Sequence, residues 1–308
     1  MTATDLDQSP LAAIDDASVW LNSEPLTSAA LRGHVVMVDF WTYSCVNWLR
    51  TLPYVRAWHE RFRHRGLVVL GVHAPEFGFE HDLDNVRRAT GELNVSYPVV
   101  IDNDFTIWRS FQNHYWPAIY LLDGAGRVRF HHFGEEAYPE IERTSQRLLG
   151  VHEDLVRVEA GGLSEAADWR SLRSQETYLG LTRGERRVDS PAEGLALHQW
   201  TLSGDWSIGE EAAALHAISG SISYSFEARD LNMVLAPPAS GGPVRFDVRL
   251  NGRPPGDDHG MDIDASGSGV VEAPRMYQLV RLRTPIRRQT FEIAFHETGV
   301  RAYVVTFG

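Results

Sequence analysis

Apolar and polar positions repeat with two different periods along the first half of the chain. Residues 34–41, 67–74 and 118–123 are short apolar runs, which are typical of strands buried at the centre of a sheet. Between the first two runs, apolar side chains recur at three- and four-residue spacing across 47–66, and this spacing predicts an amphipathic helix. Pro53 lies inside that helix and is expected to kink it.

The alternation of helices and strands continues to about residue 150. The further elements expected are a helix over 80–93, strands over 97–102 and 128–134, a hairpin turn at 124–126 and a closing helix over 138–149. Strand, helix, strand, helix, hairpin and helix is the order of an α/β domain. Residues 1–150 are therefore predicted to form an α/β domain, a mixed sheet flanked by helices.

The second half of the chain has a different pattern of apolar and polar residues. From about residue 191, short alternating segments are divided by Gly, Pro and Asn, and this pattern favours an all-β sandwich, jelly-roll-like in type. Residues 151–190 are polar, rich in Gly and Arg, and only weakly periodic, as expected of a connecting segment. The predicted organisation is an α/β domain over 1–150, a connecting segment over 151–190 and a β-sandwich over 191–308.

The charge of the chain excludes some partners and some chemistry. With a net charge of −12, the chain lacks the basic surface that drives phosphate binding, so no nucleic-acid partner is expected. All 29 basic residues are Arg, which excludes chemistry that depends on a lysine amine. The chain has no run of about 18 apolar residues, and its beginning lacks the basic and apolar regions of a signal peptide. We expect a cytoplasmic protein without a membrane partner.

One cysteine lies in the segment DFWTYSCVNW, residues 39–48. Because Cys45 is the sole cysteine of the chain, no intrachain disulfide is possible, and its thiol is either reactive or inert and buried. A cysteine at the first turn of a helix, after a buried strand, lies where the helix dipole and unpaired backbone N–H groups stabilise a thiolate. The thiolate is the form that attacks a disulfide or a peroxide.

The segment VDFWTYSCVNW resembles the active-site segment of thioredoxins, in which a strand ending Asp-Phe-Trp leads into a Cys-x-x-Cys helix start. On that match Asp39 corresponds to the buried acid, Trp41 to the packing tryptophan and Cys45 to the nucleophile. Trp48 falls at the position of the resolving cysteine. The resemblance therefore implies a thioredoxin-like site that has kept its nucleophile and lost its second thiol.

A second segment carries the same resemblance. YWPAIYLLD, residues 115–123, is similar to the thioredoxin segment whose cis-proline faces the nucleophile. Pro117 is the matching residue, and the Trp116–Pro117 peptide bond is therefore expected to be cis.

The closer resemblance is to DipZ-type proteins, whose soluble part joins a TlpA-like thioredoxin domain to a β-sandwich resembling carbohydrate-binding modules. WTYSCVN, TLPYV, GVHAPEF, NHYWPAIYLLD and HHFGE resemble the thioredoxin half, and ETYLG, RMYQLVR and AYVVTFG resemble the sandwich half. The chain departs from this family in its lack of a membrane-spanning portion and of a second cysteine. A mixed disulfide formed at Cys45 would then have to be released by an external thiol.

Two residues near the thiol are candidates for a direct part in its chemistry. Thr42 precedes Cys45 by three residues, the interval seen in peroxiredoxins, where the hydroxyl hydrogen-bonds the thiolate and the incoming peroxide. The upstream proline of that family is replaced here by Val38, and a turn-forming threonine is the alternative. Asp39 is a candidate proton carrier because burial raises a carboxyl pKa; the alternative is a residue retained from a dithiol ancestor.

Aromatic residues gather in the two segments expected to flank the thiol. The candidates for substrate binding are Trp41, Tyr43, Trp48, Trp116 and Pro117, with Tyr115 nearby. Trp41 is expected mainly to pack in the core, whereas Trp48 and Trp116 are expected to rim the substrate groove. An indole in place of a resolving cysteine narrows the groove and offers a face for stacking or for a cation. Such a groove favours a small substrate over a protein strand.

Other polar and aromatic residues give weaker signals. The histidines have no metal-ligand spacing on one element, and no metal site is expected at His73, His81, His114, His131 or His132. Residues expected near the groove, either to position a ligand or as solvated charges, are Glu76, Arg109 and Glu135. Residues of the sandwich that form either a sugar platform or part of the core are Trp200, Trp206, Tyr224 and Tyr277.

These patterns predict a cytoplasmic one-cysteine oxidoreductase. The Cys45 thiolate attacks a hydroperoxide or a small disulfide, and a low-molecular-weight thiol clears the resulting sulfenate or mixed disulfide. The thiol is a co-substrate, no bound cofactor is expected, and a homodimer is left open. The alternatives are a monothiol reductase of mixed disulfides that does not react with peroxide, and a non-catalytic thioredoxin-like binding or adaptor protein.

Overall fold

The computed structural model describes residues 9–189, 194–283 and 285–308. The chain forms two compact units, the first ending at Ser164 and the second beginning at Glu165, and each is described by itself below. None of the helices in these described ranges is both long and apolar enough to cross a membrane.

The first unit contains six strands and four α-helices within its described residues. The strands are β1 (Trp20–Leu21), β2 (Val35–Trp41), β3 (Leu67–His73), β4 (Val99–Ile101), β5 (Ala118–Leu122) and β6 (Val128–Phe133). The helices are α1 (Val46–Phe62), α2 (Leu83–Glu92), α3 (Thr106–Ser110) and α4 (Tyr138–Leu149). The strands predicted from short apolar runs and the helices predicted from three- and four-residue spacing are thereby confirmed.

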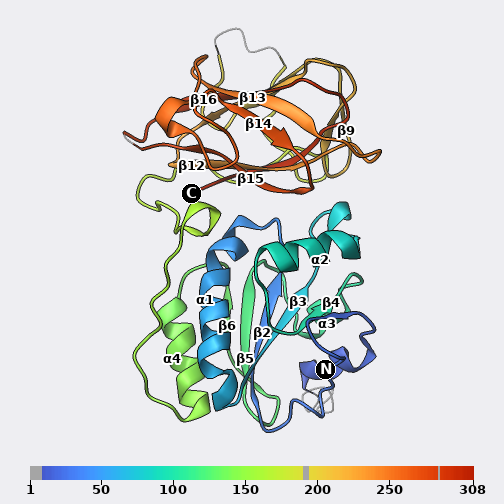
Figure 1. The fold of residues 1–308 in the computed structure, drawn as a ribbon, viewed down its shortest axis with the longest axis vertical. Coiled ribbons are helices and arrows are strands. Elements are labelled where there is room, and N and C mark those ends of the chain that lie inside the picture. Colours follow the sequence, from blue (N-terminus) through green and yellow to red (C-terminus); the bar gives the residue numbers. More distant parts are fainter. Residues whose placement is uncertain (1–8, 190–193, 284) are drawn as a thin grey trace. The chain divides into compact units, whose positions relative to one another are not determined.

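The strands form one mixed sheet in the order β1-β4-β3-β2-β5-β6. Strands β2, β3 and β4 run parallel, whereas β5 is antiparallel to β2 and β6 is antiparallel to β5. Figure 1 shows α1 and α4 side by side against this sheet. The predicted mixed sheet flanked by helices is confirmed.

Alternation along β2 decides which residues reach the thiol. Val36, Val38 and Phe40 point to one face of the sheet, where they join a core that includes residues of α3 and of a 3-10 helix at Pro10–Asp16. Asp39 and Trp41 point to the opposite face, where both contact α1 through Trp48. The one polar residue in the middle of this buried strand therefore faces the helix that begins after Cys45.

Helix α1 runs without interruption through Pro53 and ends in a 3-10 turn before Gly66, which has a left-handed φ of 97°. A buried hydrogen bond fastens it to α4, because Trp58 Nε1 donates to Glu142 Oε2 over 3.0 Å. The backbone amide of Val156 donates to the same carboxylate. Glu142 thus ties together α1, α4 and the chain that follows α4.

The second predicted helix begins later than expected. It was expected from residue 80, but α2 begins at Leu83, because Asp82 caps it by accepting a hydrogen bond from the Asp84 amide over 2.9 Å. Residues Gly78–His81 form a separate 3-10 turn that contains Glu80. The short helix α3 had no clear sequence signal; its first amides donate to the buried carboxylate of Asp102.

The described part of the second unit is built of strands. They are β7 (Thr177–Tyr178), β8 (Trp200–Ser203), β9 (Trp206–Ile208), β10 (Ala213–Leu215), β11 (Ser221–Phe226), β12 (Asp230–Ala236), β13 (Val244–Leu250), β14 (Ser268–Val271), β15 (Arg275–Arg281), β16 (Gln289–Phe295) and β17 (Arg301–Phe307). One antiparallel sheet has the order β15-β12-β17-β10-β9, with β7 also paired to β17, and the other has the order β14-β13-β16-β11-β8.

Side chains from both sheets meet in a single apolar core, so the predicted all-β sandwich is confirmed. Trp200, Tyr224 and Tyr277 are fully buried in this core, while Trp206 is half-buried at its edge. The Tyr224 hydroxyl lies 2.7 Å from the hydroxyl of Thr177. Three of the four aromatic residues considered for a sugar platform are therefore packing residues without an exposed face.

The start of the second unit is held by a cluster of charged side chains. Asp230, which is 1% exposed, accepts hydrogen bonds from both Arg229 and Arg281 at 2.7 Å. Glu165 binds the same two guanidinium groups at 3.2 and 2.5 Å. We call these four residues the Glu165 cluster. The residues 151–190, expected as a connecting segment, thus divide between the units, since the amide of Val156 binds within the first unit and Glu165 within the second.

Gly71→Ala is expected to lower the free energy of unfolding of the first unit by about 1–3 kcal/mol, because an added methyl group in a packed core displaces its neighbours. A β-carbon at residue 71 would lie 2.9 Å from Trp41 Nε1 and 3.0 Å from the Tyr97 ring. Both rings are fully buried and cannot move aside.

Gly91→Ala on α2 is the matched control, since no atom lies within 4 Å of its added carbon. This variant should be unchanged or more stable by up to about 1 kcal/mol. Calorimetry of the full chain measures both variants. Equal melting temperatures for the two would contradict the packing described around Gly71.

Candidate active site

Cys45 lies at the junction of a loop and α1. Its backbone is extended, and its carbonyl accepts the first hydrogen bond of the helix, from the Leu49 amide, over 3.0 Å. The side chain is half-buried, and Sγ lies 3.7 Å from the backbone carbonyl oxygen of Trp116, within hydrogen-bonding range for sulfur. The structure therefore places the thiol at the positive end of the α1 dipole, as the sequence predicted.

The segment opposite the thiol has the geometry expected for it. The Trp116–Pro117 peptide bond is cis, which confirms the prediction. Trp116 is half-buried, and its Nε1 donates to the carbonyl of Ala74 over 3.0 Å. The amide of Gly134 donates to the carbonyl of Pro117 over 2.8 Å. Both sides of this loop are thereby fixed to the ends of β3 and β6.

Trp48 does not line an open groove, so the expectation that it rims the site is corrected. Its side chain has no exposed surface, because it stacks on Trp41 with ring centroids 4.3 Å apart and an interplanar angle of 20°. Its Nε1 also donates to Asp39 Oδ2 over 3.1 Å. Trp41, equally buried, is a packing residue as expected. Neither indole offers a face to a ligand in this structure.

Asp39 is a fully buried carboxylic acid beneath the start of α1. Oδ2 accepts hydrogen bonds from Trp48 and from the Tyr97 hydroxyl, the latter over 3.3 Å. Burial raises the pKa of Asp39 from 3.8 to about 7, against the opposing effect of these two hydrogen bonds. The raised pKa suits a proton carrier, yet the hydrogen-bond partners described for the carboxylate are aromatic side chains rather than the thiol.

Thr42 and Tyr43 are both buried in the loop before Cys45. The Thr42 side chain has a small lowering effect on the pKa of Glu80, but its buried hydroxyl makes no hydrogen bond of ordinary geometry in the described structure. The Tyr43 ring stacks over His73 with centroids 6.0 Å apart. The prediction that Tyr43 lines the groove is therefore corrected, and Thr42 has no exposed surface for an incoming ligand.

Glu80 is the residue of this site that the sequence analysis missed. It is fully buried, with Oε1 accepting from the Ser44 hydroxyl and Oε2 accepting from the amide of Phe77 over 3.0 Å. Burial, followed by the charge of Glu76, raises the pKa of Glu80 from 4.5 to about 7. The available signal was weak, because an acidic residue at an expected helix start is normally a solvated one.

Glu135 is likewise buried, which corrects its reading as a possible surface charge. It forms an ion pair with Arg50 over 2.8 Å, and the two side chains are 6% and 3% exposed. Burial raises the pKa of Glu135 even though Arg50 opposes the rise. Because Arg50 belongs to α1 and Glu135 follows β6, the pair fixes the thiol's helix to the segment next to Pro117. Glu76 is half-buried and Arg109 exposed.

The exposed aromatic surface near the thiol comes from other residues. Tyr115 and Phe133 are 56% and 38% exposed, and their ring centroids are 5.2 Å apart. Tyr115 directly precedes Trp116, and Phe133 precedes Gly134, whose amide binds Pro117. These two rings and the half-buried Trp116 are therefore the aromatic groups with exposed surface in the segments around Pro117.

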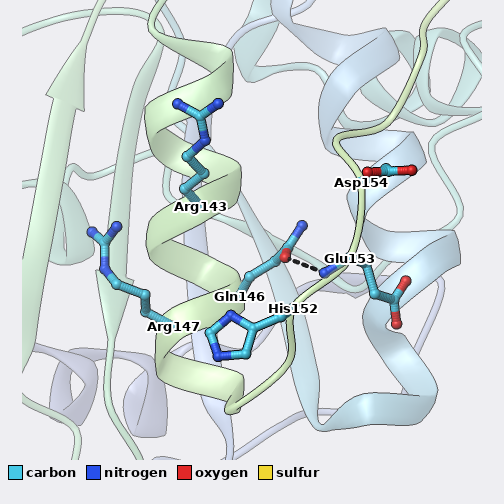
Figure 2. Close-up of a pocket in the computed structure, with 6 residues that line it drawn as sticks. All are labelled: Arg143, Gln146, Arg147, His152, Glu153 and Asp154. Atoms are coloured by element: carbon cyan, nitrogen blue, oxygen red, sulfur yellow. Dashed lines mark hydrogen bonds between the residues drawn. The ribbon is translucent and has the colours of Figure 1, made fainter.

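A shallow surface pocket of the first unit lies on α4 and the chain after it, as Figure 2 shows. Its lining residues are Arg143, Gln146, Arg147, His152, Glu153 and Asp154. The Gln146 side chain accepts from the amide of Glu153 over 2.8 Å, and the Glu153 carboxylate pairs with Arg61. The guanidinium groups of Arg143 and Arg147 do not meet in Figure 2, so this surface presents no common anion site. No group of three potential metal ligands occurs among the residues that the structure covers.

The pKa of Asp39 makes the stability of the first unit depend on pH. The carboxyl titrates at about 7 in the folded chain and near 3.8 when unfolded. Between these values the folded chain binds more protons, so the free energy of unfolding falls as the pH rises from about 4 to about 7. Asp39→Asn keeps an acceptor for Trp48 but cannot ionise. This variant is expected to lose the decrease in the free energy of unfolding that comes from Asp39.

At pH 8 the Asn variant should be more stable than the native chain, by an amount on the order of 4 kcal/mol at most. Hydrogen exchange of peptides from the inner strand β2, at pH 5 and pH 8, measures the difference. Asp16→Asn, at an exposed position, is the control and should follow the native chain. An identical pH dependence in all three proteins would disprove the neutral, buried Asp39.

Comparisons with known proteins agree with the two units. Residues 13–131 match the AhpC/TSA family, and residues 174–308 match the family described as thioredoxin-like C-terminal domain. Protein DipZ of Mycobacterium bovis is 32% identical over 252 residues, which is 76% of this chain and 35% of DipZ. The chain thus spans about a third of the length of that relative.

Smaller relatives match the first unit. The thiol-disulfide oxidoreductase YkuV of Bacillus subtilis is 24% identical over 144 residues, covering 47% of this chain and 97% of YkuV. A thiol-disulfide isomerase structure from Corynebacterium glutamicum aligns with a TM-score of 0.42 and 23% identity, over 48% of this chain and all of that one. The chain is thus similar to part of DipZ and to the thiol-disulfide oxidoreductase YkuV, and it carries in succession a match to the AhpC/TSA family and a match to the thioredoxin-like C-terminal domain.

Proposed function

We propose that the first unit is a one-cysteine thiol-disulfide oxidoreductase that exchanges disulfides with a low-molecular-weight thiol. The observation that carries the proposal is the pairing of a half-buried thiol at the start of α1 with a fully buried Trp48 one turn later. The thiol is presented beside the Pro117 loop, as in a disulfide-exchanging site. Since the chain holds one cysteine, the second sulfur of every exchange comes from another molecule.

The proposed cycle has two balanced steps. The Cys45 thiolate attacks one sulfur of a small disulfide, forming a Cys45–S–S–R bond and releasing the other half as a thiolate. A second small thiolate then attacks the R-bearing sulfur, which restores the Cys45 thiolate and releases a new small disulfide. One cycle takes up one small thiolate, releases another and leaves a mixed small disulfide; a second cycle, in which a further small thiolate acts on that mixed disulfide, completes the two-electron reduction of the substrate.

Hydroperoxide reduction is the second candidate, and the Thr-x-x-Cys interval favours it. In that reaction the thiolate would take the terminal oxygen of the peroxide to give a sulfenic acid, and the rest of the peroxide would leave as an alcohol or water. Two small thiols would then return the sulfenic acid to thiol, with release of water and one small disulfide. The burial of Thr42 counts against this candidate, because its side chain has no exposed surface on which to receive a ligand. We therefore rank disulfide exchange first.

The co-substrate is proposed to be a small thiol with an aromatic or cationic group. Tyr115 and Phe133 present exposed rings next to the Trp116–Pro117 loop, and such rings stack on flat groups and attract cations by about 0.5–2 kcal/mol. A small-thiol reductant is maintained in reducing compartments, so we propose that the protein works in the cytoplasm. The glutathione tripeptide is expected to be a poorer partner than a heteroaromatic or betaine-bearing thiol.

Exchange at Cys45 is tested by mass spectrometry of the full chain. Incubation with mixed disulfides of several small thiols should add one thiol mass to Cys45 and release it again on addition of excess thiol. Cys45→Ser should form no adduct, and its turnover rate should fall by about 1,000-fold or more, as expected when a nucleophile is removed. Peroxide consumption is followed in parallel to rank the second candidate.

A reactive Cys45 that forms adducts without turnover would instead favour a thioredoxin-like binding protein. Slow alkylation of Cys45 at all pH values, with no adduct from any disulfide, would remove the proposal altogether. Adduct formation with peroxide turnover exceeding disulfide turnover would reverse the ranking of the two candidates.

Trp48→Cys tests the position of the missing thiol. A cysteine there lies in the first turn of α1, three residues after Cys45, and is expected to form an intramolecular disulfide on mild oxidation. The cost is a cavity beside Trp41 and the loss of the bond to Asp39, about 3–5 kcal/mol of stability. Turnover should then need less of the small thiol.

Trp48→Phe is the matched control, since it fills most of the same volume and supplies no sulfur. It should keep the dependence on small thiols while losing only the hydrogen bond to Asp39. If Trp48→Cys folds and its two thiols do not join on oxidation, the proposed geometry of the helix start is wrong.

A further inference from the structure

The two oxygens of the Glu80 carboxyl have different partners. Oε2 accepts hydrogen bonds from the backbone amides of Glu76 and Phe77, at 2.5 and 3.0 Å. Oε1 accepts from the hydroxyl of Ser44 at 2.5 Å. Backbone amides only donate, so Oε2 is committed as an acceptor in every protonation state.

A proton on this carboxyl must therefore be carried by Oε1. Once Oε1 carries a proton it becomes a donor, and the hydrogen bond with Ser44 reverses its direction. The Ser44 hydroxyl then accepts from Glu80, and its own proton is released for another acceptor. Ser44 is itself buried and directly precedes Cys45 in the chain, and a thiolate at that residue is able to accept such a hydrogen bond.

We propose that Glu80 is a positioning residue for Cys45, with the proton on Oε1 deciding whether the Ser44 hydroxyl can donate to the neighbouring thiolate. The inference rests on the proposed function, since it names a control on the same thiol. With Glu80 protonated, the hydroxyl stabilises the thiolate. With Glu80 ionised, the hydroxyl is held by the carboxylate, and a buried negative charge also opposes the charge on sulfur.

The surroundings of Glu80 place this change near neutral pH. Burial raises its pKa to about 7, and the charge of Glu76 adds to the rise, while Ser44, Thr42 and the Phe77 amide oppose it. On the adjacent strand, burial lowers the pKa of His73 to about 3, so that this ring stays neutral. His81 follows Glu80 directly and is exposed, so a His81 variant is included as a control for this neighbour.

The test is the rate of Cys45 alkylation by iodoacetamide between pH 5.5 and 8.5. Because the chain has one cysteine, the reagent reports on this thiol alone and needs no turnover. The native profile should depart from a single ionisation, with a second inflection near pH 7. Glu80→Gln mimics the protonated acid, since its amide oxygen still accepts from the two backbone amides while its NH₂ group donates to Ser44.

At pH 8 Glu80→Gln should react about three- to tenfold faster than the native chain, with no difference at pH 5.5. Ser44→Ala should slow the reaction at pH 5.5. The effect of Glu80→Gln should shrink in the Ser44→Ala background, because the two residues act through one hydrogen bond. His81→Gln should keep the native profile. Glu142→Gln, which alters another buried glutamate of the same unit, should also keep it.

An undiminished Glu80→Gln effect in the Ser44→Ala background would show a purely through-space charge and overturn the role of Ser44. A single ionisation in the native profile, or a change caused equally by Glu142→Gln, would overturn the proposal for Glu80. Both results are independent of turnover. A Glu80-dependent profile without small-thiol turnover would leave this inference standing and remove the proposed function.

Discussion

The surroundings of the thiol depend on the hydrogen bond from the Trp48 indole to the Asp39 carboxyl. The Trp41 ring stacks on Trp48 and shields this hydrogen bond. This arrangement fills the space between the start of α1 and the sheet with two fully buried indoles. The half-buried thiol lies at the edge of this packed region, within 3.7 Å of the Trp116 carbonyl oxygen.

Three buried carboxyl groups lie in the part of the first unit that surrounds β2 and the start of α1. Glu135 has a counter-ion in Arg50, whereas Asp39 and Glu80 have hydrogen-bond donors but no cation among their described contacts. An unpaired buried charge is costly, and so both acids are held largely neutral below about pH 7. A thiolate formed at Cys45 would then be the first negative charge of its neighbourhood rather than one of three.

The parts of the molecule that were predictable from sequence are those set by local periodicity. Strands β2 and β3, helix α1 and the sandwich follow from repeats of two or about 3.6 residues, and Pro117 follows from a short segment with a fixed backbone role. The burial of Trp48 was not predictable, because it depends on a stacking partner seven residues away and on an acid in the preceding strand. For the same reason the sequence analysis did not identify Glu80 as part of the site, and it allowed Glu135 to be a solvated surface charge. Their partners Ser44 and Arg50 lie 36 and 85 residues distant, and no local pattern marks an acid as buried.

The Glu165 cluster has a consequence for where the second unit can be cut from the chain. The family match begins at residue 174, but the two guanidinium groups that bind Asp230 also bind Glu165, and Arg229 donates in addition to the carbonyl of Ala166. A fragment that starts at 174 would keep both arginines and lose one of the two carboxylates that neutralise them. The folded second unit therefore begins at Glu165, before the start of the family match at residue 174. Its first residue contributes through ion pairs rather than through strand pairing.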